Sequence, residues 1–216
     1  MLEVRKLDAG YGLLPVLRGI DLDIRPGEIT LLVGANGAGK STLLRTIAGF
    51  LKPTAGTILF DGTELAGRKP DDIARSGARL VLDGHRVFRD LSVWDNLRLG
   101  AAARRDRAAF DALAADVIDL FPILGEKRKL PAGSLSGGQQ QMLALAQAFL
   151  GGPKLLMCDE PSLGLAQSLL PAIFEALRAW AARGTAILVV EQHVDIARPY
   201  ASKILHMDRG MLQPTP

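Results

Sequence analysis

The 216-residue chain has an ordinary globular composition, with 48% hydrophobic residues, 23% charged residues and a formal net charge of +3. This small basic excess does not argue for a nucleic-acid or lipid surface. The longest apolar runs have only five residues, whereas a membrane-spanning helix needs about 20, and the N-terminus lacks the basic start and apolar core of a signal peptide. We therefore expect a single cytosolic domain in which the one cysteine, Cys158, is a buried thiol.

The first 33 residues alternate apolar and polar positions, as short antiparallel strands do. Among them, Tyr11 lies in a Gly-Tyr-Gly segment. A tyrosine in a loop is most simply a packing residue, but the distance of Tyr11 from the next motif also allows it to stack on a bound base.

The apolar run Ile29–Val33 leads into a glycine-rich segment with the spacing Gly-x-x-x-x-Gly-Lys-Ser, followed by a helix-forming stretch. This order of strand, loop and helix indicates a phosphate-binding P-loop. The glycines let backbone N–H groups converge on phosphate oxygens, Lys40 reaches toward the β- and γ-phosphates, and Ser41 is placed to ligate Mg²⁺. The predicted phosphate-binding residues are Gly34, Ala35, Asn36, Gly37, Ala38, Gly39, Lys40, Ser41 and Thr42.

After this loop, residues 56–60 and 79–82 are predicted as strands, and the first enters a tight turn at Asp61-Gly62. From about residue 85 to residue 150 the apolar positions follow helical spacing, which predicts an inserted helical subdomain. Directly before its last helix stand Ser136, Gly137, Gly138 and Gln139. A hydroxyl and paired amides at a helix N-terminus suit a γ-phosphate, although an ordinary capping turn has the same composition.

Residues 155–158 form an apolar run that ends in two carboxylates, Asp159 and Glu160. In a P-loop fold, the first acid at such a strand end is positioned to hold the Mg²⁺ hydration shell, and the second polarises an attacking water. We therefore assign Asp159 to the metal and Glu160 to the catalytic base. Further along, residues 169–180 predict an amphipathic helix, residues 186–190 a buried parallel strand, and residues 204–212 a closing hairpin.

The order of these elements predicts an α/β fold, the P-loop NTPase fold with a RecA-like core and a mostly parallel sheet. Antiparallel strands are expected at the N-terminus, and the helical subdomain is inserted in the core. We expect one domain over residues 1–216, with residues 1–84 and 151–216 as the catalytic core and residues 85–150 as the helical subdomain.

Three segments follow one another in the order found in the ATP-binding cassette ATPases. They are the P-loop, the Leu-Ser-Gly-Gly-Gln segment that ends at Gln139, and the apolar run that ends in Asp159-Glu160. The chain resembles this family over nearly its entire length. The resemblance implies hydrolysis of ATP with Mg²⁺, and head-to-tail pairing of two chains, so that residues 136–139 of one chain complete the site on the P-loop of the other. It also implies that Tyr11 is the base-stacking aromatic.

Further segments look like those of the ATPase subunits of branched-chain amino-acid importers, with urea and amide importers close: Glu160-Pro-Ser-Leu-Gly-Leu165, Val190-Glu-Gln192, residues 86–97 and Leu120-Phe-Pro122. This resemblance implies uptake of branched-chain amino acids or a related small solute through separate permease chains. It implies an indirect partnership with a substrate-binding protein, a second ATPase chain that is identical or paralogous, and a peripheral position on the inner face of the cell membrane. A nucleic-acid partner is not expected.

Three positions depart from the pattern of the wider family. Asp83 stands where most members have a glutamine in the metal shell and importer relatives have a glutamate. Gln192 stands at the switch position, where most members have a histidine that contacts the γ-phosphate, and His193 follows it. An amide donates a hydrogen bond to phosphate but does not titrate, so either Gln192 or His193 is expected to make this contact. Gln147 stands where relatives often carry arginine, with no predicted consequence.

Two other classes of protein share a P-loop. A soluble cassette ATPase of DNA repair or translation usually has long coiled-coil insertions or two fused cassettes. A P-loop kinase or GTPase would leave residues 135–139 unexplained, and a GTPase would carry an Asn-Lys-x-Asp segment. The sequence has no long coiled-coil insertion, no second cassette and no Asn-Lys-x-Asp segment. We therefore expect an importer ATPase, in which the surface around residues 83–97 receives a cytoplasmic helix of the permease.

Overall fold

The computed structural model describes residues 1–82, 84, 87–102, 107–192 and 194–213, and their strands form two sheets. The antiparallel sheet has the order β2-β1-β4-β5 and consists of β1 (Leu2–Tyr11), β2 (Leu14–Ile24), β4 (Ala55–Phe60) and β5 (Thr63–Glu64). The second sheet has the order β10-β9-β3-β8-β7-β6 and is parallel except for its last hairpin. Its strands are β3 (Ile29–Val33), β6 (Ala78–Val81), β7 (Leu155–Asp159), β8 (Ala186–Glu191), β9 (Lys203–Asp208) and β10 (Met211–Gln213).

The helices connect these strands and cover the parallel sheet. They are α1 (Lys40–Ile47), α2 (Pro70–Ser76), α3 (Val93–Gly100), α4 (Arg107–Leu120), α5 (Pro122–Glu126), α6 (Gly137–Leu150), α7 (Leu170–Ala182) and α8 (Val194–Ala197). Short 3-10 turns lie at Ala132–Ser134, Gln167–Leu169 and Arg198–Tyr200. In the described part of the chain, no helix has both the length and the apolar content needed to cross a membrane.

The N-terminal strands are longer than the sequence pattern suggested, because bulges let each of them continue. The register between β1 and β2 shifts between Val4 and Leu7 and again before Ala9. Lys6 and Gly19, with φ of 46° and 59°, adopt the left-handed conformation on the two strands. A bulge adds an unpaired residue and strengthens the local twist without ending the strand. The apolar alternation therefore restarts after each bulge, which makes one long strand resemble several short ones.

The central strands are apolar throughout because both faces of the parallel sheet are covered. On β3, Leu31 belongs to the hydrophobic cluster shared with α6 and α7, whereas Leu32 belongs to the cluster shared with α1 and the antiparallel sheet. Neighbouring residues of β7 and β8 divide between the two clusters in the same way. Continuous apolar runs of this kind are typical of parallel strands buried on both sides. The predicted strand at residues 186–190 and the closing hairpin are confirmed.

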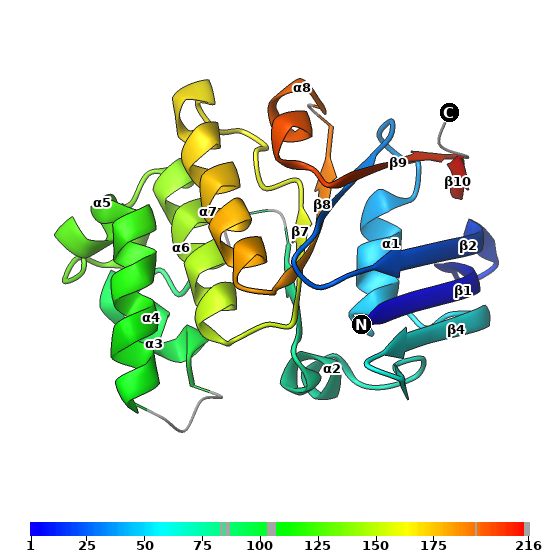
Figure 1. Ribbon diagram of the computed structural model, residues 1–216, viewed down its shortest axis with the longest axis horizontal. Helices are drawn as coiled ribbons and strands as arrows, with labels where there is room; N and C mark the ends of the chain where they lie inside the picture. The colour runs from blue at the N-terminus through cyan, green and yellow to red at the C-terminus, as the bar shows by residue number, and fades with distance from the viewer. Residues whose placement is uncertain (83, 85–86, 103–106, 193, 214–216) are drawn as a thin grey trace.

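Figure 1 shows the antiparallel strands and α1 at one end of the molecule, α3 to α6 at the other, and the parallel sheet between them. The strands β3, β8 and β7 are parallel neighbours, so residues that follow their carboxyl ends lie at one edge of the sheet. This edge receives the P-loop and the carboxylates after β7. The division into a core of residues 1–84 and 151–216 and a helical subdomain of residues 85–150 stays a prediction.

Candidate nucleotide-binding site

The P-loop links the end of β3 to the start of α1 and depends on its glycines. A Cβ on Gly34 would lie 2.2 Å from the carbonyl oxygen of Met207, so only glycine fits there. Gly37 and Gly39 have φ of 79° and 110°, a region that disfavours residues with a side chain. Gly39 is the N-cap of α1, and no side chain in the described residues caps this helix end. A helix start without a side-chain cap directs its first N–H groups toward an anion.

The Lys40 ammonium lies inside the loop and is only 4% exposed. Its Nζ donates hydrogen bonds to the carbonyl oxygens of Gly34 (2.8 Å) and Ala35 (3.2 Å). It also lies 3.8 Å from a carboxylate oxygen of Glu160. The loop thus holds a buried cation whose neighbour is the acid predicted to be the catalytic base.

Ser41 and Asp159 meet although they come from different elements. The Ser41 hydroxyl donates a hydrogen bond of 2.9 Å to Oδ1 of Asp159, at the end of β7. Both side chains present oxygen atoms, the ligand type that Mg²⁺ prefers, and such sites commonly use one or two protein ligands together with substrate phosphates. Across the described residues, no group of three or more His, Cys, Asp or Glu side chains forms an all-protein metal cage. The donor set therefore fits a metal held jointly by the protein and a phosphate.

Glu160 follows Asp159 and has an unusual backbone conformation, with φ of 48°. A residue with a side chain in this region typically costs 1–3 kcal/mol and persists only where its surroundings impose it. Its N–H donates to the carbonyl oxygen of Val190 (3.0 Å), and its carbonyl accepts from the N–H of Leu163 (3.1 Å). These bonds place the Glu160 carboxylate beside Lys40, where its side chain is 17% exposed.

Glu191 is a further acid at this edge, outside the set of predicted site residues. It ends β8, is 1% exposed, and accepts hydrogen bonds from both the N–H and the hydroxyl of Ser162. Burial raises the pKa of the Glu191 carboxyl, the bonds from Ser162 and Gln192 oppose this, and the charge of Glu160 adds to it. The sequence signal for Glu191 is its place directly after the apolar run 186–190. Because the carboxyl ends of parallel strands lie at one edge of the sheet, a carboxylate there is expected near the P-loop.

The turn at residues 136–139 caps α6. Ser136 accepts a hydrogen bond from the N–H of Gln139, and the Gln139 side-chain oxygen accepts from the N–H of Ser136 and from Lys127. This is the capping turn that the sequence left open as an alternative. Ser136 and Gly137 are nevertheless exposed, and a side chain at Gly138 would collide with Leu169. The turn therefore offers an exposed helix N-terminus.

The remaining predicted residues take separate positions. Tyr11 is the last residue of β1, pairs with Leu14 and is 46% exposed. Gln192 is exposed just after β8, and its N–H donates to Glu191. Asp83 and His193 lie outside the described residues. The contacts predicted for these four side chains stay predictions.

Gln147, for which the sequence predicts no consequence, has a clear structural role. Its amide donates hydrogen bonds to the backbone oxygen (3.0 Å) and side-chain oxygen (2.9 Å) of Asn96 on α3. Asn96 is fully buried and bonds in turn to Phe88, Leu91 and Ser92 in the preceding loop. Gln147 and Asn96 therefore fasten α6 and α3 to the loop at residues 88–92.

Comparison with known proteins gives the family. The family model described as ABC transporter matches residues 17–163. The chain is also 38% identical over 212 residues to the high-affinity branched-chain amino acid transport ATP-binding protein BraG of Pseudomonas aeruginosa, which covers 98% of this chain and 91% of that protein. The chain belongs to the ABC transporter family of ATP-binding proteins. It is an ATP-binding cassette ATPase, and the ATPases of this family bind ATP or ADP.

Two further relatives agree with this assignment. The cassette is 37% identical to the probable branched-chain amino acid transport ATP-binding protein LivF of Archaeoglobus fulgidus, with 91% of this chain and 84% of that protein covered. Its fold is similar to the ADP conformation of an ATP-binding cassette of an ABC transporter, with a TM-score of 0.88, 25% identity, and coverage of 99% of this chain and 89% of that one. The predicted cassette fold is therefore confirmed.

Proposed function

We propose that this cassette is the ATP-hydrolysing subunit of an importer that carries branched-chain amino acids or a related small solute through separate permease chains. The observation that carries the chemistry is the meeting of Lys40, Ser41, Asp159 and Glu160 at one sheet edge. The transport assignment is supported by the two relatives described above, both of which are named as branched-chain amino acid transport ATP-binding proteins.

In this proposal each side chain has one task. Lys40 neutralises charge on the transferred phosphoryl group, and the loop N–H groups orient the phosphates. Ser41 and Asp159, together with Asp83, would hold Mg²⁺, and a bound Mg²⁺ would offset the negative charge of the phosphates. Glu160 accepts a proton from the attacking water. Gln192 or His193 contacts the γ-phosphate, and Tyr11 stacks on the adenine.

Two chains are needed for a complete site. In the described structure, the side-chain hydrogen bonds of Ser136 and Gln139 connect them to each other and to Lys127, and none connects them to the P-loop. The exposed turn 136–139 is therefore available to a second chain. We propose head-to-tail pairing, with an identical copy or a paralogue, in which this turn of each chain closes over the ATP held by the other.

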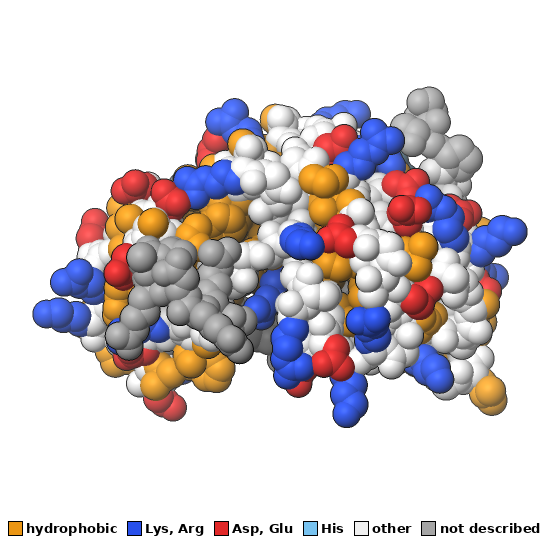
Figure 2. All heavy atoms as spheres, turned by 60° about the horizontal axis from the view of Figure 1, so that its bottom comes forward, with side chains coloured by type: hydrophobic (Ala, Val, Ile, Leu, Met, Phe, Trp, Pro, Cys, Tyr) orange, Lys and Arg blue, Asp and Glu red, His pale blue; other side chains and the backbone are white. Residues whose placement is uncertain are grey.

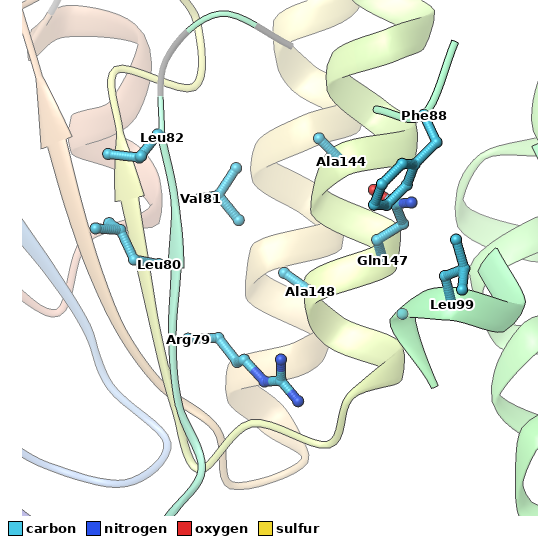
Figure 3. A pocket seen from close by; sticks show the side chains of 10 residues that line it. Arg79, Leu80, Val81, Leu82, Phe88, Leu99, Ala144, Gln147 and Ala148 are labelled. Carbon is cyan, nitrogen blue, oxygen red and sulfur yellow. The ribbon is translucent and has the colours of Figure 1, made fainter. Parts of the chain in front are cut away.

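The permease surface is proposed to lie between the edge strand β6 and the helices α3 and α6. A cavity of about 260 Å³ opens there, lined by β6, Phe88, Leu99 and Gln147 (Figure 3). Phe88 and Leu99 are 59% and 43% exposed, so the cavity has an apolar rim. Figure 2, which turns the lower side of the molecule forward, shows Lys and Arg side chains beside the hollow between its two ends.

Arg79 on β6 gives this surface a charge preference. Its guanidinium borders the cavity, and its Nε is buried with no hydrogen-bond partner among the described residues. Burial alone lowers the pKa of this group from its usual value. We therefore propose that the permease segment places an acidic side chain against Arg79. We also propose that the cassette, bound to its permease, lies peripherally on the inner face of the cell membrane.

The pairing can be tested with Glu160→Gln, which should bind ATP without hydrolysing it. The purified variant, alone or mixed with a paralogous cassette from the same organism, should form a dimer only when ATP is added, as measured by size-exclusion chromatography with light scattering. A monomer at saturating ATP in both mixtures would contradict the proposed sandwich.

Where the cassette pairs with itself, a mixture of two inactive variants tests the head-to-tail arrangement. Ser136→Glu disrupts the turn at residues 136–139, and Glu160→Gln removes the catalytic base, so each variant alone should be inactive. In a mixed dimer, one site combines an intact Glu160 with an intact Ser136. The mixture should therefore recover about one quarter of the wild-type rate if chains pair at random. A mixture no faster than its components would exclude this arrangement.

A further inference from the structure

Glu191 is a buried carboxylate, and its partners in the described part of the chain are uncharged. In the described residues it forms no salt bridge with a lysine or arginine. Its donors are instead neutral: the N–H of Ser162 at 3.0 Å, the hydroxyl of Ser162 at 2.7 Å and the N–H of Gln192 at 3.3 Å. A buried acid held only by neutral donors is unfavourable unless all of these bonds form together.

The residue that Glu191 holds belongs to the turn that begins at Glu160. The N–H of Leu163 donates to the carbonyl oxygen of Glu160, and the N–H of Leu165 donates to that of Ser162. Gly164 has a φ of 71°, so the turn contains two left-handed positions, of which Glu160 is the one with a side chain. A conformation of this kind persists only where surrounding contacts fix it.

The end of β8 supplies two of those contacts. Val190 accepts the N–H of Glu160 itself, and the next residue, Glu191, accepts both donors of Ser162. The turn is therefore fastened to one strand end at two points, one at Glu160 and one two residues later. Loss of the second point leaves the turn free to relax toward an ordinary backbone conformation, which would move the Glu160 carboxylate away from Lys40.

We propose that Glu191 is a positioning residue for ATP hydrolysis, which holds the backbone of Glu160 through Ser162. This inference rests on the proposed role of Glu160 as the catalytic base. A carboxylate suits the task because both of its oxygens accept hydrogen bonds. A glutamine would accept at one atom only and would turn an N–H donor toward the donors of Ser162 or Gln192.

The test compares variants of the full-length cassette in steady-state ATP hydrolysis and in ATP binding. Glu191→Ala should lower kcat about 10- to 100-fold, because a displacement of about 1 Å at a catalytic group has effects of this size. Ser162→Ala, which removes one of the three bonds and no buried charge, should lower kcat by a smaller factor. Both variants should bind ATP within about two-fold of the wild-type affinity, since neither residue belongs to the P-loop.

Val189→Ala is the matched control for a general loss of stability. Val189 is buried on β8, and its side chain lies on the same face of the strand as that of Glu191, but it makes none of the bonds to Ser162. This variant should lower the melting temperature and leave kcat within about two-fold of wild type. If Glu191→Ala and Ser162→Ala both keep wild-type kcat, or if Val189→Ala loses as much kcat as they do, the proposal is wrong.

A double variant separates positioning from a merely structural role. In a Glu160→Gln background, adding Glu191→Ala should change the residual rate by less than about two-fold, because the group that it positions is already absent. If the loss of kcat in the double variant equals the product of the losses in the two single variants, the proposal is wrong. The single Glu160→Gln variant tests the proposed function separately. If it stays active, Glu160 is not the base, whereas an inactive Glu160→Gln beside a fully active Glu191→Ala and Ser162→Ala refutes only the role of Glu191.

Discussion

The Ser41 hydroxyl donates a hydrogen bond of 2.9 Å to Asp159, although 118 positions separate the two residues in the sequence. Ser41 follows β3, Asp159 ends β7, and β8 lies between these strands in the sheet. The bond therefore spans the width of one intervening strand at the carboxyl edge. It joins the phosphate loop to the carboxylates and brings together two oxygen ligands of the proposed metal site.

Asp159→Asn should weaken the metal site and spare the phosphate loop. An amide is a poorer Mg²⁺ ligand than a carboxylate, so the Mg²⁺ concentration needed for half-maximal ATP hydrolysis should rise at least about tenfold, since even outer-shell substitutions have effects of 10- to 100-fold. Nucleotide binding measured in EDTA should not change. An unaltered Mg²⁺ requirement would show that Asp159 does not hold the metal.

Lys40→Ala should remove most of the affinity for ATP. A hydrogen bond to a charged group contributes about 1.5–3 kcal/mol, which corresponds to a loss of about 10- to 150-fold in affinity. Titration calorimetry measures this directly. Lys154→Ala is the control, because Lys154 is an exposed lysine paired with Asp61 and lies far from the loop in the fold. Similar affinities for the two variants would contradict the role of Lys40.

Asn96→Ala should lower the free energy of unfolding by roughly 2–4 kcal/mol, because it leaves the N–H of Phe88 without a buried partner and removes one of the two hydrogen bonds of the Gln147 amide. Gln147→Ala should have a smaller effect, of about 1 kcal/mol, because Asn96 keeps its bonds to the loop at residues 88–92. Urea denaturation of the two variants provides the comparison. Equal effects of the two substitutions on the free energy of unfolding would contradict the larger contribution expected of Asn96.

Cys158 should be unreactive in the folded cassette. The thiol is completely buried, and burial, with a smaller contribution from Glu191 and Asp159, raises its pKa far above the usual range. Because the thiolate is the reactive form, Ellman's reagent should not modify the native protein at pH 8 and should modify one thiol per chain after denaturation. Rapid modification of the native protein would contradict the burial.

The parts of the site that the sequence predicts are those in which all the residues belong to one short segment, so that their spacing determines their arrangement. The P-loop glycines and Lys40 lie within a few residues of each other, and the Asp159-Glu160 pair follows directly on a buried strand, so spacing alone indicates their chemistry. Their meeting at one edge follows from parallel strands, which the apolar runs predict.

The contacts that the sequence does not reveal join residues that are far apart in the chain. Glu191 reaches Ser162 across 29 positions, and Gln147 reaches Asn96 across 51. Both pairs are hydrogen bonds between side chains whose identities allow many partners, and no local spacing selects one of them. The N-terminal antiparallel strands are predicted, but the full length of β1 and β2 is not, because a bulge interrupts the alternation pattern of a strand that continues beyond it.

The proposed chemistry is tested most directly by ATP hydrolysis and ATP affinity in Glu160→Gln, measured beside the wild-type cassette. Removal of the base should lower kcat about 10²- to 10⁴-fold, because general base catalysis contributes a factor of this size. The dissociation constant for ATP should stay within about two-fold of wild type, because the P-loop is unchanged. A Glu160→Gln variant that hydrolyses ATP at nearly the wild-type rate would contradict the assignment of Glu160 as the base.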